Sequence, residues 1–201
     1  MIPLGVLASA RVAASGFTTI TDSFNRADSA TTLGSTDTGQ AWEIVGGTWG
    51  VMNGTMYKSA GGASLRAHAV VDWGLADMSV TVQIPTLGSV GGYPHLVGRF
   101  ANEGNGYFLQ LNPPPSALVR RVGGVNANMI SNLGTTVAGD AMTLSIREQE
   151  GGTVLTVYRN DAQIGTYTDT TVGRPVGTRA GVFSFGLSTD ARFDNFTVEA
   201  P

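Results

Sequence analysis

The 201-residue chain contains no cysteine and only two histidines. Without cysteine it can form neither a disulfide nor a thiolate metal site, so the apolar core alone must stabilise the fold. His68 and His95 lie far apart in the sequence, and neither belongs to a cluster with the spacing of zinc ligands. A zinc site is therefore not expected.

Charge is also scarce. Charged residues make up 13% of the chain, about half the usual quarter. The 12 Lys and Arg and the 15 Asp and Glu give a net charge of −3, and the two signs are interspersed. Proteins that bind nucleic acids need a basic face or stripe to neutralise phosphates. We therefore do not expect a nucleic acid as a partner.

Long apolar runs are missing, since no stretch approaches the roughly 20 apolar residues of a membrane-spanning helix. The first fourteen residues are apolar, but no basic residue precedes them, Pro3 and Gly5 break the run and Arg11 interrupts it. A secretion signal has a basic start followed by an unbroken apolar stretch. The sequence thus predicts no membrane partner, no signal peptide and synthesis in the cytoplasm.

What the chain does have is 28 glycines and 42% apolar residues. From Phe17 onward, short runs of β-branched and aromatic residues alternate with Gly, Asn and Asp, a pattern typical of a β-sandwich. We expect about fourteen strands in one domain, with no helix. The clearest runs cover residues 18–24, 48–52, 65–71, 78–84, 95–100, 106–111, 117–122, 141–148, 153–159, 162–168, 179–185 and 192–200.

Residues 141–168 carry the clearest strand pattern. Met142, Leu144 and Ile146 alternate with polar residues, which predicts a strand with one buried face. Gly151-Gly152 and Asn160-Asp161 can both adopt the positive φ of tight hairpin turns. The segment is therefore predicted to form a three-stranded meander.

Two parts of the sequence resemble a known fold family. The stretch "DSFNRADSATTLGSTDTGQAWEIVGGTWGVMNGTMY" resembles the start of concanavalin A-like, laminin-G-like jelly rolls of bacterial and phage surface proteins. The segments "LSIREQEGGTVLTVYRNDAQIGTYTD", "TRAGVFSFG" and "ARFDNFTVEA" are similar to the last strands of that family, whose closing strand returns beside the first. The resemblance implies an all-β, two-sheet antiparallel jelly-roll sandwich over residues 17–201, preceded by a short arm over residues 1–16. It does not fix the activity, because this fold occurs in lectins, hydrolases and structural modules.

The arm sequence, "MIPLGVLASARVAASG", resembles the N-termini of minor tail proteins of phages that infect actinobacteria. This resemblance implies a virion tail protein that is made in the host cytoplasm and is present in multiple copies or as a homo-oligomer. The apolar side chains of Ile2, Leu4, Val6 and Leu7 would then dock on other tail proteins. The alternative is that the arm folds back onto its own jelly roll.

Catalysis is not predicted. Glycosidases need two carboxylates about 5–10 Å apart across a cleft. Glu148 and Glu150 are the one spaced pair on a predicted strand, but Glu150 would lie at a hairpin tip beside Gly151-Gly152. The third acidic residue that the family's hydrolases would place after them is missing, and no Gly-x-Ser-x-Gly elbow occurs.

A calcium site is the one metal site that we consider. Asp22 and Asp194 lie in "TDSF" and "FDNF", on strands that the family places side by side. Their carboxylates and nearby carbonyls would suit Ca²⁺, which binds six to eight oxygens. The alternative is that both carboxylates cap turns or accept backbone N–H groups.

Glycan binding needs exposed aromatic rings, with amides or arginine around them for the hydroxyl groups. The region from Trp73 to Asn105 combines such residues with glycine-rich loops, whereas Trp42 and Trp49 and the late phenylalanines Phe183, Phe185, Phe193 and Phe196 are expected in the core. We therefore predict a tail adhesin that binds host cell-surface carbohydrate, with a purely structural virion protein or a polysaccharide hydrolase as alternatives. The candidate glycan-binding residues are Trp73, Tyr93, His95, Arg99 and Asn105.

Overall fold

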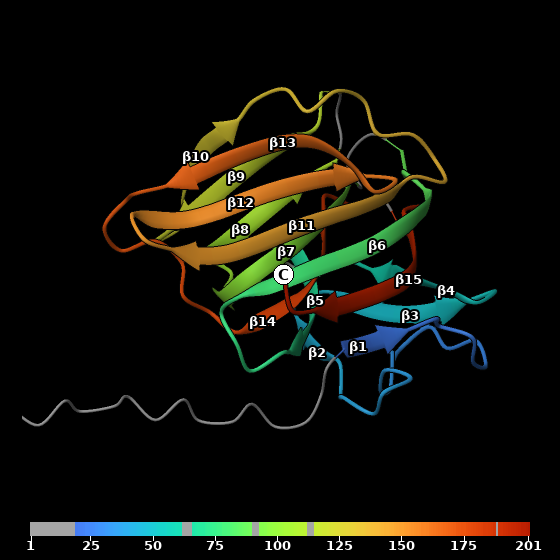
Figure 1. Cartoon of the computed structure of the whole chain (residues 1–201). Coiled ribbons are helices and arrows are strands. Elements are labelled where there is room, and N and C mark those ends of the chain that lie inside the picture. The colour runs from blue at the N-terminus through green and yellow to red at the C-terminus, as the bar shows by residue number, and fades with distance from the viewer. Residues whose placement is uncertain (1–18, 62–65, 90–92, 112–114, 188) are drawn as a thin grey trace, which may run out of the picture.

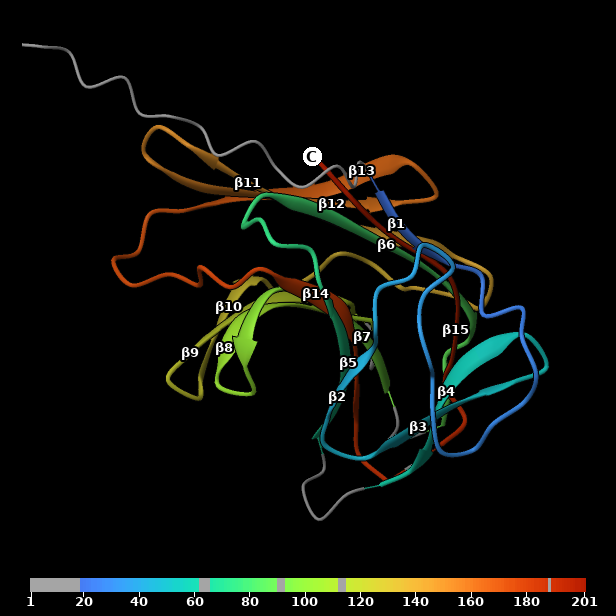
Figure 2. The same cartoon turned by 90° about the horizontal axis from the view of Figure 1, so that it is seen from below.

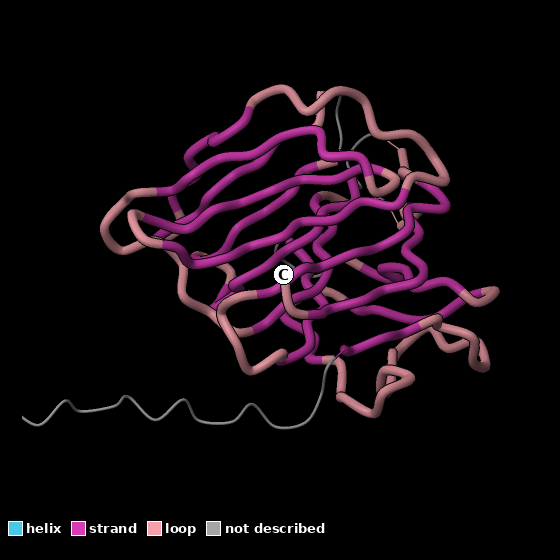
Figure 3. The backbone as a smooth tube through the Cα atoms, viewed as in Figure 1, coloured by secondary structure: helices cyan, strands magenta, loops and turns pink. Residues whose placement is uncertain are grey.

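The structure is a computed structural model that describes residues 19–201 except 62–65, 90–92, 112–114 and 188. The predicted arm, with Ile2, Leu4, Val6 and Leu7, lies outside the described residues. Figure 3 shows strands joined by loops and turns, without a helix in the described part. Accordingly, no helix there is long and apolar enough to cross a membrane.

In the described residues, fifteen strands form two antiparallel sheets that pack face to face (Figures 1 and 2). The eight-stranded sheet has the order β13-β12-β11-β6-β15-β4-β3, with β1 also paired to β15, and the seven-stranded sheet has the order β10-β9-β8-β7-β14-β5-β2. The fold is therefore the predicted all-β sandwich. The strands are β1 (Thr19–Asp22), β2 (Glu43–Val45), β3 (Thr48–Met52), β4 (Thr55–Ala60), β5 (Arg66–Asp72), β6 (Met78–Thr86), β7 (Tyr93–Asn102), β8 (Asn105–Gln110), β9 (Ala117–Val122), β10 (Val125–Ile130), β11 (Ala141–Gln149), β12 (Gly152–Arg159), β13 (Ala162–Asp169), β14 (Arg179–Phe185) and β15 (Arg192–Glu199).

Two topological predictions are confirmed. The last part of β15, the final strand, pairs with all of the first strand, β1, from Thr19 opposite Glu199 to Asp22 opposite Phe196. Strands β11, β12 and β13 form the predicted meander. Its second turn has φ values of 49° at Asn160 and 65° at Asp161, the left-handed conformation that a two-residue hairpin requires.

The main core lies between the sheets. Met142, Leu144 and Ile146 on β11 are fully buried, as their alternation predicts. Trp42 and Trp49 are buried as well. Of the late phenylalanines, Phe193 and Phe196 join this core and Phe183 is buried elsewhere, whereas Phe185 is 39% exposed and corrects our expectation for that residue.

The seven-stranded sheet is strongly curved. Figure 2 shows its strands arching so that the hollow side points away from the eight-stranded sheet. A second cluster of buried apolar side chains lies apart from the main core, on this outer side. It contains Val70, Val97, Phe100, Phe108, Val119 and Phe183.

Candidate functional site

The outer face of the seven-stranded sheet is built by strands that bury both of their sides. On β5, Ala67, Ala69 and Val71 belong to the main core, whereas the alternate residues His68 and Val70 face outward. A strand that is solvated on one side would carry polar residues at those alternate positions. The outer side of this sheet is therefore apolar and aromatic where a solvated face would be polar.

Three rings form a stack across this face. The strand register places Phe183 of β14 opposite His68 of β5 on one side and opposite His95 of β7 on the other. The ring centroids are 4.5 Å apart for His68 and Phe183 and 4.9 Å apart for His95 and Phe183, with interplanar angles of 14° and 25°. Phe108 of β8 meets Phe183 edge to face at 5.8 Å. The result is a continuous aromatic floor.

A pocket of about 310 Å³ lies over this floor. Tyr93 and the half-exposed Phe185 add rings to it, and Gln110 and Asn126 add amides. Arginines enter from β5 and β9, and no Asp or Glu is among the described residues that line it. The lining consists of Arg66, His68, Tyr93, His95, Phe108, Gln110, Val119, Arg121, Asn126, Phe183 and Phe185.

Both histidines of the floor are neutral near neutral pH. Burial lowers the pKa of His95 to about 3 and that of His68 to about 4. The Nδ1 atom of His68 lies 3.3 Å from the carbonyl oxygen of Val45. By contrast, the buried Nδ1 atom of His95 has no hydrogen-bond partner among the described residues. Since buried polar groups are normally paired, this atom is an unused hydrogen-bonding group beside the pocket.

The structure divides the predicted glycan-binding residues. Tyr93 and His95 line the pocket, whereas Trp73, Arg99 and Asn105 do not. The Trp73 ring packs against the main core and its Nε1 donates to the Asp77 carbonyl at 3.0 Å. The Asn105 side chain holds a turn, donating to Asn102 and accepting from the backbone N–H of Gly123.

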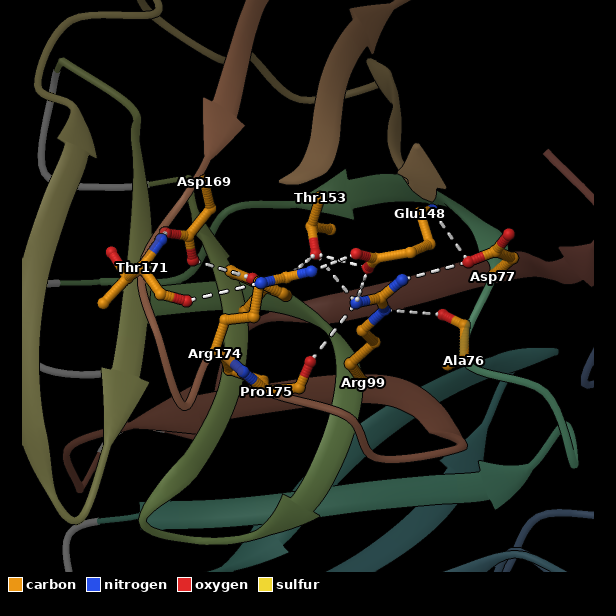
Figure 4. Close-up of polar contacts among 10 residues, drawn as sticks. Ala76, Asp77, Arg99, Glu148, Thr153, Asp169, Thr171, Arg174 and Pro175 are labelled. Carbon is orange, nitrogen blue, oxygen red and sulfur yellow. Dashed lines mark hydrogen bonds and ion pairs between the residues drawn. The ribbon is translucent and has the colours of Figure 1, made fainter. Parts of the chain in front are cut away.

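Arg99 has a structural position that differs from our expectation. Its side chain is 1% exposed, so it cannot present a donor at the surface. Nε donates to the Ala76 carbonyl at 2.8 Å and Nη2 to Asp77 at 3.0 Å. Nη1 donates to Glu148, Thr153 and the Pro175 carbonyl, so every nitrogen of the guanidinium is engaged (Figure 4).

A β-bulge accounts for this position. At Gly98 the side-chain position faces inward, toward Ile146. The next residue, Arg99, has a φ of +46° and its side chain also lies on the inner side of the sheet. Val97 and Phe100 on either side face outward. Two consecutive inward residues interrupt the alternation of the strand, and they bring a long cationic side chain between the sheets.

Glu148 belongs to the same polar cluster. Arg174 binds its carboxylate from the other side, and Thr153 donates to it at 2.8 Å (Figure 4). The hydrogen bond from Arg174 is the main cause that lowers the pKa of Glu148 to about 2. A carboxylate held as an anion cannot serve as the general acid of a glycosidase at neutral pH. Glu150, the other carboxylate of the spaced pair, lies exposed in the hairpin turn, as the sequence predicts.

The carboxylate of Asp22 is buried and already has donors. Oδ1 accepts from the backbone N–H of Phe24 at 2.9 Å, and Oδ2 accepts from Trp42 Nε1 at 2.7 Å and from Arg26. Asp194 accepts from the N–H of Asn195. Within the described ranges no three His, Cys, Asp or Glu side chains gather as metal ligands. These contacts match the alternative role, accepting N–H groups; calcium binding stays a prediction.

Most of the pocket residues were not predicted from the sequence. Arg66, His68, Phe108, Gln110, Arg121 and Asn126 were not proposed as binding residues. One signal was present in the sequence. Arg66 and His68 are two residues apart on one strand, Phe183 and Phe185 are two residues apart on another, and the other face of both strands is apolar. That spacing indicates one shared face on each strand, but not that β5 and β14 are neighbours.

Solved structures share this fold at low sequence identity. The carbohydrate binding module CBM66 from Bacillus subtilis aligns with a TM-score of 0.58 and 17% identity, over 79% of this chain and 95% of the module. The carbohydrate recognition domain of Emp47p aligns with a TM-score of 0.53 and 11% identity, over 92% of this chain and 94% of that domain. A mutant of the GH43 protein BlXynB from Bacillus licheniformis aligns with a TM-score of 0.62 and 15% identity, over 90% of this chain but 39% of that protein.

No protein-family model and no curated protein matches the chain. At these identities the solved structures show the fold alone. That fold is the concanavalin A-like jelly roll that the sequence predicts, and carbohydrate-binding modules and recognition domains have it too.

Proposed function

We propose that this domain binds carbohydrate without turning it over, and that its binding site is the pocket on the outer face of the seven-stranded sheet. The observation that carries the proposal is the aromatic floor with amides and arginines around it. The fold shared with carbohydrate-binding modules and recognition domains supports it.

The chemistry of the lining suits a sugar. The exposed parts of Tyr93 and Phe185 offer flat apolar surface to the C–H face of a pyranose ring. Gln110 and Asn126 carry amides that can both donate to and accept from hydroxyl groups. A volume of about 310 Å³ lies at the small end of the range for ligand sites, so the pocket accommodates a single sugar residue rather than a long segment of polysaccharide.

The proposal that the domain is not an enzyme rests on Glu148. The candidate acid of a glycosidase mechanism is tied to two arginines in the polar cluster of Figure 4, and it does not line the pocket. No carboxylate is present among the described lining residues to act as a nucleophile or base. Binding without catalysis is consistent with this arrangement.

The experiment compares two exposed rings on opposite sheets. Phe185→Ala removes a pocket ring that is 39% exposed, and Tyr167→Ala removes a ring on β13 that is 40% exposed. Binding of both variants to a glycan array and to cell-wall polysaccharide is measured, with the melting temperature as a check of folding. Loss of binding in Phe185→Ala alone supports the pocket. Equal binding by the two variants would contradict it, and release of reducing ends from the polysaccharide would contradict the absence of catalysis.

We further propose that the protein is a component of a virion tail, where its domain serves as an adhesin that attaches to the host cell surface. The support for this setting is the resemblance of residues 1–16 to the arms of minor tail proteins. Several copies on one particle would compensate for weak single sites, because attached copies raise the effective concentration. Deleting residues 1–16 should leave a cooperatively folding domain that no longer enters particles. Normal incorporation of the deletion variant would rule out the arm as the anchor.

A further inference from the structure

The walls of the pocket carry charge of one sign. Arg66 comes from β5 and Arg121 from β9, and β14, β7 and β8 lie between these strands in the sheet. Because the sheet curves around its hollow side (Figure 2), two residues this far apart in strand order line the same small pocket. No described lining residue is acidic, although the whole chain has more Asp and Glu than Lys and Arg. The pocket is thus cationic in a protein with a net negative charge.

The two guanidinium groups are close enough to affect each other. Burial, and after it the charge of Arg66, lowers the pKa of Arg121 below its ordinary value. Glu103 acts in the opposite direction on Arg121, but it does not line the pocket. Two like charges over an aromatic, partly dehydrated floor repel each other, and an anion placed between them removes that repulsion.

Unused hydrogen-bonding groups lie at the same place. Arg121 donates through Nη1 to Asn126 at 2.9 Å, which orients its guanidinium, but its buried Nε has no partner among the described residues. The Nδ1 atom of His95, a residue only 4% exposed that lines the pocket, likewise has no partner in the described part of the chain. Buried polar atoms without partners are rare in folded proteins, and at a pocket they indicate groups that a bound molecule would satisfy.

We propose that the pocket selects an acidic saccharide, a sugar residue that carries a carboxylate or a phosphate, with the anionic group between Arg66 and Arg121 and the ring against Tyr93 and Phe185. The proposal rests on the proposed function and names its ligand class. Arginine suits this role because its planar fork of N–H donors matches the oxygen atoms of carboxylates and phosphates. The neutral His68 and His95 keep the floor apolar enough to stack against the sugar ring.

The test uses probes that share one sugar ring. Galactose, galacturonic acid and galactose 6-phosphate are titrated against the whole chain and followed by NMR or calorimetry, with inorganic phosphate as a probe of the anion alone. A charge-assisted hydrogen bond contributes about 1.5–3 kcal/mol, so at least one acidic sugar should bind about tenfold or more tightly than galactose. Comparing the carboxylate with the phosphate probe identifies which anion the arginines prefer. Raising the salt concentration should reduce the difference from galactose.

Three variants locate the selectivity. Arg66→Gln and Arg121→Gln remove the charges of the pocket, and Arg147→Gln, at an exposed position on β11 of the other sheet, is the matched control. The two pocket variants should bind the acidic probe no better than galactose, while the control keeps the preference. Urea unfolding of each variant shows separately that the binding was measured on folded protein.

The outcomes separate the two proposals. Equal affinity of wild type for galactose and for both acidic probes, lost in Phe185→Ala, would overturn the acidic ligand and leave carbohydrate binding standing. Inorganic phosphate binding as tightly as galactose 6-phosphate would show that the sugar ring contributes nothing, which overturns the saccharide. If no sugar binds and the glycan array is also blank, the proposed function fails together with this inference.

Discussion

Arg99 and Arg121 belong to the same sheet, yet their surroundings differ completely. Arg99 is 1% exposed and donates from all three of its nitrogens to groups of the protein. Arg121 donates from Nη1 to Asn126, and its buried Nε, at the edge of a pocket, has no partner among the residues that the structure describes. The difference separates two uses of a guanidinium: one whose donors are all engaged holds the fold together, and one with donors to spare can receive another molecule.

The largest effect on stability is expected from replacing Arg99. In Arg99→Met the cluster loses one of its two arginines, so Asp77 loses its ion-pair partner and Glu148 keeps only Arg174. Breaking a buried ion pair from one side costs about 3–5 kcal/mol, and we expect about 3 kcal/mol here because both carboxylates are 42% exposed. Urea unfolding measures the loss, with Arg147→Met as the surface control.

Sugar binding by the folded fraction of Arg99→Met should be unchanged, because Arg99 does not line the pocket. A loss of stability below about 1 kcal/mol, the size expected of an exposed pair, would show that the cluster does not hold the sheets together.

The pocket histidines and the polar cluster around Glu148 should affect the free energy of unfolding in different pH ranges. Burial lowers the pKa values of His95 and His68 from 6.5 to about 3 and about 4, so below pH 6.5 the unfolded chain binds protons that the folded chain does not. Stability should therefore fall as the pH decreases from 6.5, by on the order of 1 kcal/mol per pH unit for each histidine. Unfolding free energies of wild type and His95→Phe at pH 7, 6 and 5 measure this slope, and the variant should have the shallower one.

Glu148 acts in a lower window. Its pKa falls from 4.5 to about 2 in the folded protein, so its contribution is present above pH 4.5 and is lost as the pH falls from 4.5 toward 2. Glu148→Gln should therefore keep the wild-type slope between pH 6.5 and 5 and differ only below it. If Glu148→Gln removes the slope above pH 5, the assignment of that slope to the pocket histidines is wrong.

A smaller effect is expected at Tyr107, between the two regions. Its hydroxyl donates to the buried carboxylate of Asp169 at 2.8 Å, and Arg120 binds the other oxygen at 2.7 Å. Tyr107→Phe removes one of these donors and should cost about 1 kcal/mol in the free energy of unfolding. Affinity for sugars should not change. A weakened affinity would mean that the inner polar groups also shape the pocket.

The smallest expected effect is that of a chelator. A calcium ion at Asp22 would have to displace Arg26 and Trp42 from its carboxylate. Because these donors already satisfy the buried anion, we expect equal melting temperatures with and without EDTA at matched ionic strength. A lower melting temperature with EDTA would instead support the predicted site with Asp194, since a bound metal stabilises the folded state.

The sequence reveals strands well where one face is buried and the other is wet. Met142, Leu144 and Ile146 mark β11 in this way, and the turn at Asn160-Asp161 marks its neighbours. The strands absent from the clearest runs lack that contrast. Strand β10 is an exposed edge with the sequence "VNANMI", β2 is three residues long, and β4 buries Lys58, whose Nζ finds the Gly186 carbonyl 128 residues away.

The site could be predicted only in part. Tyr93 and His95, which line the candidate pocket, were predicted because aromatic residues stand beside glycine-rich loops, a local signal. By period two, Arg99 should share the face of His95 and Val97, and only the bulge at Gly98 and Arg99 turns it inward. The arginines of the pocket, Arg66 on β5 and Arg121 on β9, come together only because the sheet is curved. No local sequence pattern encodes that curvature.

The pairing of β1 with β15 has one more consequence. Thr19 and Glu199 are direct neighbours across this ladder, so the described domain starts and finishes at one point of its surface. A domain whose two ends are adjacent can be inserted into a loop of another protein without distorting either fold. It can also be circularly permuted, with a short linker between the present ends and new ends at the Gly151-Gly152 hairpin. The pocket opens on the other sheet, so a unit transferred in this way would keep the pocket intact.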